Sequence, residues 1–179
     1  MSFPGSAHLP PVGAEVSCSG YSVNVVAHIE GLGATHLDLR GGIRFRVEGH
    51  TRSGLGEAKL RIIGQEFGGE HSALGRITLS QADTGTTPLT LLQLARNDPP
   101  AFRMSLFQDV ILTTEKGPNG TGPLNLYSSK TMIHLADTLA DFPPRGGICQ
   151  LQEQVGFASA SAPGKVIATI KEFPLTLSH

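Results

Sequence analysis

The sequence predicts an all-β protein, an antiparallel up-and-down β-barrel of about eight to ten strands with at most one or two short helices. A β-sandwich is the alternative fold. Apolar and polar residues alternate in many short runs, which is typical of antiparallel sheet with one face in a core. The 22 glycines and 12 prolines fall mostly between those runs, where turns are expected.

The alternation places the strands in order along the chain. Ile43, Phe45 and Val47, for example, alternate with charged residues, and the same pattern recurs from residue 102 to residue 112. The expected strands span residues 14–29, 34–40, 43–50, 57–66, 71–81, 87–94, 101–115, 123–136, 147–158 and 164–175. Two segments also qualify as helices, residues 88–98 and 129–142, and the apolar spacing of the second fits either a helix or a strand.

Length and composition predict a single domain over residues 13–179, preceded by a flexible segment of residues 1–12. The net charge of −1 does not indicate the excess of positive charge that is typical of nucleic-acid-binding proteins. The first residues lack the basic and apolar regions of a secretory signal, and no apolar run approaches the roughly 20 residues of a membrane helix. We therefore expect a cytoplasmic protein with no membrane partner.

The two cysteines, Cys18 and Cys149, lie far apart in the sequence and lack the close spacing of a metal site. They could pair if the first and last strands are neighbours. Buried, reduced thiols are the preferred interpretation.

Two Gly-Leu-Gly segments, each preceded by a histidine, indicate two hairpins. In the first, a three-residue loop at residues 31–33 sets His28 opposite His36, since residues that face each other must share a side of the sheet. With Asp38 these histidines could ligate a metal, although exposed polar partners are the preferred reading. We therefore expect no metal.

The second hairpin is expected to turn at residues 53–54. That register sets Glu48 opposite Lys59, His50 opposite Glu57, and Arg46 unfavourably opposite Arg61. A corner at residues 41–42 would let Asp38 face Arg44.

Several polar residues interrupt the apolar phase of their strands. Glu153, Gln108, Tyr21 and Gln81 share the phase of neighbouring core positions. Inward polar groups suit a ligand site, because desolvation raises the pKa of a buried carboxyl so that it can act as an acid or hydrogen-bond donor. A lumen with apolar walls and a few convergent polar groups is also a common place for a small molecule. The structural alternatives are a strand end or bulge for Glu153 and backbone-bonded amides for the glutamines. For Tyr21 and Tyr127 the alternative, and the commoner case, is a residue at the rim of the core with a hydrated hydroxyl.

In strand number and size the chain resembles small calycin-like barrels, although the Gly-x-Trp motif of lipocalins is missing. That resemblance implies binding of an apolar small molecule in the barrel lumen, by a cofactor-independent cyclase or isomerase of natural-product biosynthesis. The alternatives are a non-catalytic carrier and a structural or interaction β-protein. No cofactor is expected, and a homodimer is possible. The expected catalytic residues are Glu153, Gln108 and Tyr127, and the expected ligand-binding residues are Tyr21, Phe45, Gln81, Phe102, Met104, Met132, His134 and Phe157.

Overall fold

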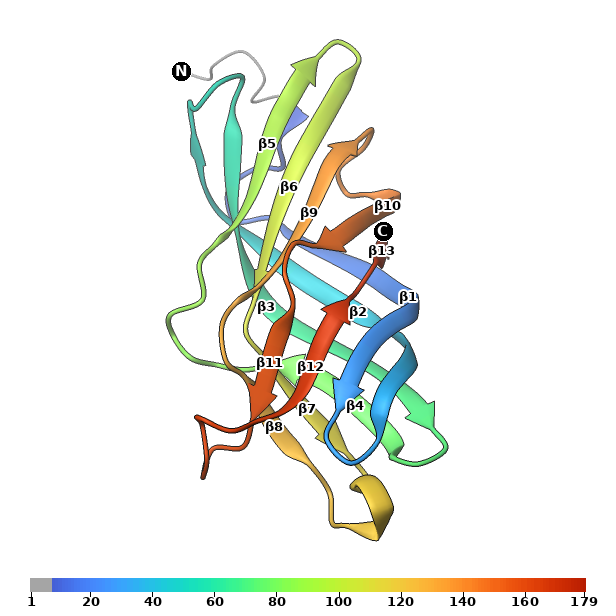
Figure 1. The fold of residues 1–179 in the computed structure, drawn as a ribbon. Helices are drawn as coiled ribbons and strands as arrows, with labels where there is room; N and C mark the ends of the chain where they lie inside the picture. Colours follow the sequence, from blue (N-terminus) through green and yellow to red (C-terminus); the bar gives the residue numbers. More distant parts are fainter. Residues whose placement is uncertain (1–7) are drawn as a thin grey trace.

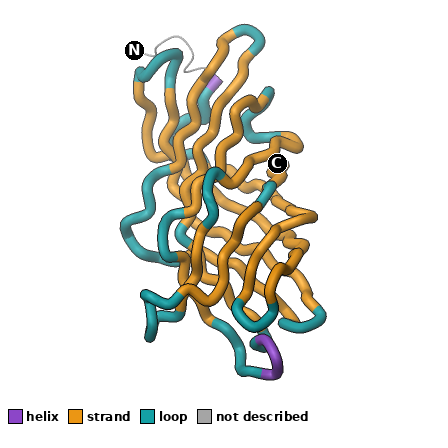
Figure 2. The backbone as a smooth tube through the Cα atoms, viewed as in Figure 1, coloured by secondary structure: helices purple, strands orange, loops and turns teal. Residues whose placement is uncertain are grey.

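The computed structural model describes residues 8–179, and β-strands are by far its main regular secondary structure (Figure 1 and Figure 2). All strand pairings are antiparallel, which confirms the predicted fold class. The strands are β1 (Glu15–Ile29), β2 (Gly33–Thr51), β3 (Glu57–His71), β4 (Gly75–Gln81), β5 (Thr90–Asn97), β6 (Pro100–Gln108), β7 (Val110–Thr114), β8 (Asn125–Ser128), β9 (Met132–Leu139), β10 (Arg145–Leu151), β11 (Val155–Ala158), β12 (Val166–Glu172) and β13 (Leu175–Ser178). A 3-10 turn, η2 (Pro118–Gly120), lies between β7 and β8.

Hydrogen bonding closes this sheet into two rings that share β1, β2 and β3. Ring A contains the shared strands with β5, β6, β9, β10 and β13, and ring B contains them with β4, β7, β8, β11 and β12. The pairing of β3 with β5 closes ring A, and the pairing of β12 with β1 closes ring B. Closure of the sheet favours a barrel over a sandwich, which would leave open edges. Two rings replace the single barrel that was expected.

The chain passes from one ring to the other five times after the shared strands. In Figure 1 ring A occupies the upper part of the molecule and ring B the lower part. The passages lie at residues 82–89, 109, 129–131, 152–154 and 173–174, between consecutive strands of different rings. We call these segments the crossovers, and the region where they meet the shared strands the joint.

The crossovers explain why the strand count was wrong. Four expected strands, at residues 101–115, 123–136, 147–158 and 164–175, are each two strands joined by a crossover. Conversely, the expected corner at Gly41 and Gly42 does not exist, because β2 runs straight through it. Both helix candidates are strands, residues 90–97 as β5 and residues 132–139 as β9, since ring A pairs them with β6.

Glycines on the shared strands allow a close approach of backbones at the joint. Gly41 pairs with Gly20 on one side and Phe67 on the other. A Cβ on Gly41 would lie 1.8 Å from the carbonyl oxygen of Glu66, and one on Gly69 would lie 2.2 Å from that of Asp38. Only glycine permits these contacts.

The first hairpin has a three-residue loop, as predicted, but its register differs. Ile29 pairs with Gly33, so the loop is residues 30–32 and His28 faces Ala34. His36 pairs with Val26, and its Nδ1 donates a 2.7 Å hydrogen bond to Oδ1 of Asn24. The predicted pairing of the two histidines is therefore wrong.

The second hairpin sets Arg46 opposite Arg61, as predicted, but its register shifts just beyond that pair. Glu48 falls in the resulting bulge, so Lys59 pairs with Gly49 and Glu57 with Thr51. Oε1 of Glu48 accepts hydrogen bonds from both arginines, at 3.0 Å from Arg46 Nη2 and 2.8 Å from Arg61 Nε. The bulge thus supplies the anion that offsets two facing cations.

The inward side chains of both rings form one continuous apolar cluster. It includes Phe45, Leu60 and Met104 from ring A and Ile77 and Phe157 from ring B, all fully buried. Residues 1–7 of the expected flexible segment lie outside the described residues, but Leu9 is buried in this cluster. The Pro10 carbonyl oxygen also lies 2.6 Å from Nε2 of His50, so this part of the segment is held against the domain.

Candidate functional site

Polar side chains gather at the crossovers. At each crossover a strand leaves one ring, its backbone ladder is interrupted, and side chains must satisfy the released backbone groups. Gln81, for example, donates from Nε2 to the carbonyl oxygen of Ile62 at 2.9 Å, in the gap of β3 between its partners β4 and β5. This accounts for polar residues that interrupt an apolar phase.

Three side chains from different strands form a buried polar chain through the joint. His134 on β9 places Nε2 3.1 Å from the carbonyl oxygen of Phe173 and Nδ1 2.8 Å from the Gln108 amide. The other end of the Gln108 amide lies 2.6 Å from the amide of Gln65 on β3. The Phe173 ring packs edge-on against the imidazole, with 4.9 Å between ring centroids.

Burial determines the charge of this imidazole. His134 has no exposed surface, and the loss of hydration lowers its pKa to about 4, against the opposing effect of the hydrogen bond to the Phe173 backbone. At neutral pH the ring is therefore neutral and holds one N–H.

Gln65 carries the polar chain to a pocket of about 350 Å³ at the joint. The segment from Ala82 to Leu89 forms one wall of this joint pocket, and β3 forms another. Its lining mixes apolar and polar side chains. They are Arg61, Ile62, Ile63, Gln65, Gln81, Ala82, Asp83, Thr84, Gly85, Thr87, Pro88, Leu89 and Asp109.

Asp109 holds in place the crossover of residues 82–89, which forms one wall of this pocket. Its carboxylate accepts hydrogen bonds from the hydroxyls of Thr87 and Thr131, the latter at 2.8 Å, and its backbone oxygen accepts one from the N–H of Ala82. One carboxylate therefore ties three crossovers together.

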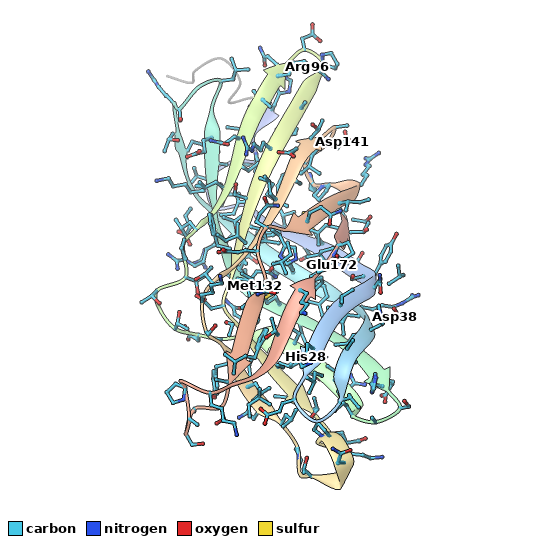
Figure 3. All side chains as sticks on the ribbon, in the orientation of Figure 1. His28, Asp38, Arg96, Met132, Asp141 and Glu172 are labelled. Atoms are coloured by element: carbon cyan, nitrogen blue, oxygen red, sulfur yellow. The ribbon has the colours of Figure 1, made fainter. Side chains whose placement is uncertain are left out.

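The structure brings together three of the residues predicted for the site. Gln108 and His134 form the buried chain, and Gln81 lines the joint pocket. Met132 begins β9 at mid-height of the molecule and is fully buried (Figure 3). The other apolar candidates are core residues distributed over both rings, and they are Phe45, Phe102, Met104 and Phe157.

Three predicted residues lie on the surface instead. Glu153 is in the crossover after β10, where it forms an ion pair of 3.3 Å with Lys130 of the neighbouring crossover, so the strand-end alternative holds. Tyr21 is 47% exposed because the inward phase of β1 switches at a bulge between Ser22 and Val25. Tyr127 is 40% exposed and lines a separate pocket of about 290 Å³ next to β8 and β11, which we call the second pocket.

The metal alternative finds no support in the described part of the chain. His28, His36 and Asp38 are exposed on ring B, and Figure 3 shows His28 and Asp38 apart. Within residues 8–179, no three His, Cys, Asp or Glu side chains are grouped so that they could hold a metal ion. No helix in the same range is long and apolar enough to cross a membrane.

Sequence reasoning missed Gln65 and Asp109. Gln65 is out of phase with Leu60 and Ile62, so the alternation placed it outside. The inward phase of β3 switches between Ile62 and Gln65, and the adjacent Ile63-Gly64 pair was the available signal for that switch.

The described chain defines a class of fold, an antiparallel sheet closed into two rings around three shared strands. No protein-family model and no curated protein matches the sequence. Among solved structures, the fold is similar to that of DynF from the dynemicin biosynthesis pathway of Micromonospora chersina, with a TM-score of 0.70. The match covers 96% of this chain and 82% of DynF at 20% identity, which shows a shared fold.

Proposed function

We propose that this protein acts in natural-product biosynthesis, as a small-molecule-binding protein that works as a cofactor-independent cyclase or isomerase. The observation that carries the proposal is the joint pocket, where the amides of Gln65 and Gln81 lie in a lining that also includes apolar side chains. The fold shared with DynF, a protein of a biosynthetic pathway, supports the setting.

The structure favours the joint pocket over the expected lumen as the binding place. The inward positions of both rings are occupied by one packed apolar cluster. The joint pocket, in contrast, combines an opening to solvent with groups that converge from β3, β4 and the crossovers. Catalysis there would consist of holding one reactive conformer of the bound molecule, with the amides orienting its polar atoms.

Metabolite profiling tests the catalytic part of this proposal. Isomerisation and ring closure without loss of a leaving group conserve the molecular formula. For these reactions, deletion of the gene in its own organism should cause an isomer of the final compound, or of an intermediate, to accumulate. Complementation with the wild-type gene should remove the isomer, whereas complementation with Gln65→Leu should leave most of it in place. Tyr127→Phe, at the second pocket, is the matched control and should complement fully.

The non-catalytic carrier is the second candidate, since the same pocket could hold a molecule without converting it. A carrier predicts lower yield of the final compound in the deletion strain without any accumulating isomer. It also predicts that purified protein binds the compound and returns it unchanged. Full complementation by Gln65→Leu would contradict both functions at this pocket.

A further inference from the structure

The hydrogen bonds of the buried polar chain must all run in one direction. At one end, the carbonyl oxygen of Phe173 can only accept, so Nε2 of His134 carries a proton. A neutral imidazole has one N–H, and Nδ1 must therefore accept. Whatever lies 2.8 Å from Nδ1 has to be a donor.

The orientation of the Gln108 amide follows from that requirement. With Oε1 of Gln108 toward Nδ1, both ring nitrogens of His134 would have to donate, and the buried ring would be a cation. Burial opposes that charge, as the lowered pKa of about 4 reflects. The two ends of an amide have the same shape, so half a turn about the last bond places the Gln108 NH₂ on Nδ1.

The same reasoning fixes Gln65. Once the Gln108 NH₂ donates to Nδ1, its carbonyl oxygen faces the Gln65 amide at 2.6 Å and needs a donor there. Gln65 supplies its NH₂, which leaves its own carbonyl oxygen as the free end. Among the described residues this end of the Gln65 amide has no hydrogen-bond partner, and it is not one of the fully buried polar atoms that lack a partner. Gln65 lines the joint pocket, so its carbonyl oxygen is available there.

The orientation of the Gln81 amide follows from the same reasoning. The Ile62 carbonyl oxygen requires the NH₂ of Gln81, so the carbonyl oxygen of Gln81 is the end left for the pocket. The carboxylates of Asp83 and Asp109 also line this pocket and can only accept when ionised. Arg61 and two threonines also line the pocket, but Nε of Arg61 is engaged by Glu48 and the hydroxyls of Thr84 and Thr87 by Asp109. The carbonyl oxygens of Gln65 and Gln81 are therefore left as acceptors, and a ligand that pairs with them must bring donors.

We propose that His134, acting through Gln108, is a positioning residue that holds the Gln65 carbonyl oxygen toward the joint pocket. The pocket consequently selects small molecules that carry a hydroxyl group over analogues in which that group is an ether. This inference rests on the proposed function, because it assumes that the joint pocket binds a ligand.

The tautomer of His134 is measured first, without any ligand. Long-range proton–nitrogen NMR correlations on the folded protein at neutral pH should show a neutral ring with the proton on Nε2. A proton on Nδ1, or on both nitrogens, would overturn the inference and leave the proposed function untouched.

Selectivity is measured with two probes of nearly equal shape, 2-naphthol and 2-methoxynaphthalene. The chain has no tryptophan, so probe fluorescence can be followed without protein background from that residue. The wild-type protein should bind 2-naphthol about tenfold more tightly than the ether, because the ether leaves buried acceptors unpaired. Equal affinities would overturn the inference, whereas no saturable binding of either probe up to about 1 mM would count against the pocket itself.

Variants then separate positioning from simple structural support. His134→Phe keeps an aromatic ring against Phe173 but frees the Gln108 amide to turn, so the preference for 2-naphthol should fall to about threefold or less. Gln65→Leu, at the pocket, should abolish the preference and provides the test should His134→Phe fail to fold. Gln152→Leu, an exposed glutamine on another crossover, should keep the wild-type ratio. Loss of affinity for both probes with an unchanged ratio would contradict positioning.

Discussion

His134 combines complete burial with two polar contacts, so its protonation state is linked to the stability of the fold. Its pKa is about 4 in the folded protein and near 6.5 in an unfolded chain. Between these values the unfolded chain binds more protons than the folded protein. The free energy of unfolding should therefore fall as pH drops from about 6.5 to about 4.

The expected loss over that range is on the order of 3 kcal/mol at 25 °C. Urea unfolding at about pH 7 and about pH 4.5 measures it, with His134→Phe as the comparison. The variant should be less stable at neutral pH but should lose less on acidification. An equal loss in both proteins would show that other groups cause the pH dependence.

The cysteines should be unreactive while the protein is folded. Cys18 and Cys149 are buried, free thiols, as expected from the sequence, and burial raises their pKa values to about 11 and about 12. Reagents attack the thiolate, which is scarce at pH 8 when the pKa is this high. Titration with a thiol reagent should label neither cysteine in buffer and both in concentrated urea. Rapid labelling of either one in buffer would contradict its burial.

At the residue scale, the sequence indicated some of the polar residues at the site but not the contacts that they make. The apolar phase predicted correctly that Gln108 is buried and also singled out Gln81, while His134 was among the expected ligand-binding residues. Phase alone could not show where these residues lie relative to one another, since β6 and β9 pair with each other in ring A whereas β4 belongs to ring B. It also could not reveal Gln65, because its strand changes phase.

At the scale of elements, Gly41 allows the backbone of β2 to lie close to the backbone of β3. Gly41→Ala should destabilise the fold by about 2–4 kcal/mol or prevent folding, because its Cβ would overlap the carbonyl oxygen of Glu66. Gly64, on the neighbouring strand β3, has nothing within 4 Å of the corresponding position. Gly64→Ala should therefore change the unfolding free energy by less than about 1 kcal/mol in urea titrations. Comparable losses in the two variants would refute a steric role for Gly41.

The β2–β3 hairpin depends on Glu48 in its bulge. Hydrogen bonds from Arg61 and Arg46 lower the pKa of this carboxyl, so its contribution is present above its unfolded pKa near 4.5 and is lost as pH falls through the folded value. Glu48→Gln should reduce stability at pH 7, and added salt should shrink the difference because it screens the facing arginines. Thermal melts of both proteins at low and high salt measure this effect. A salt-independent difference would indicate a packing cause.

The bulge also explains an error in the sequence-based register. A strict alternation predicted the pair of Arg46 and Arg61 but continued past it without a shift. A bulge inserts a single residue, and alternation carries no mark of where it occurs. The same limit placed Tyr21 on the inward face. His28 was set opposite His36 for another reason, because the hairpin loop was expected at residues 31–33 and lies at residues 30–32.

At the scale of the whole molecule, the two rings should unfold together. They share β1, β2 and β3, and their inward side chains form one cluster. Hydrogen exchange of peptides from β6 in ring A and β7 in ring B, followed at increasing urea, should show loss of protection at the same concentration. Separate midpoints for the two strands would show that the rings are independent units.

The sequence by itself determined the strands, the antiparallel class of sheet and the burial of most apolar candidates, because period-two alternation records which side of a strand faces a core. Only the tertiary structure decided that the sheet closes twice, and that four long extended runs break where the chain changes ring. Ring closure depends on pairings between strands far apart in the chain, such as β1 with β12, and no local pattern encodes them. The joint pocket exists only because of that closure.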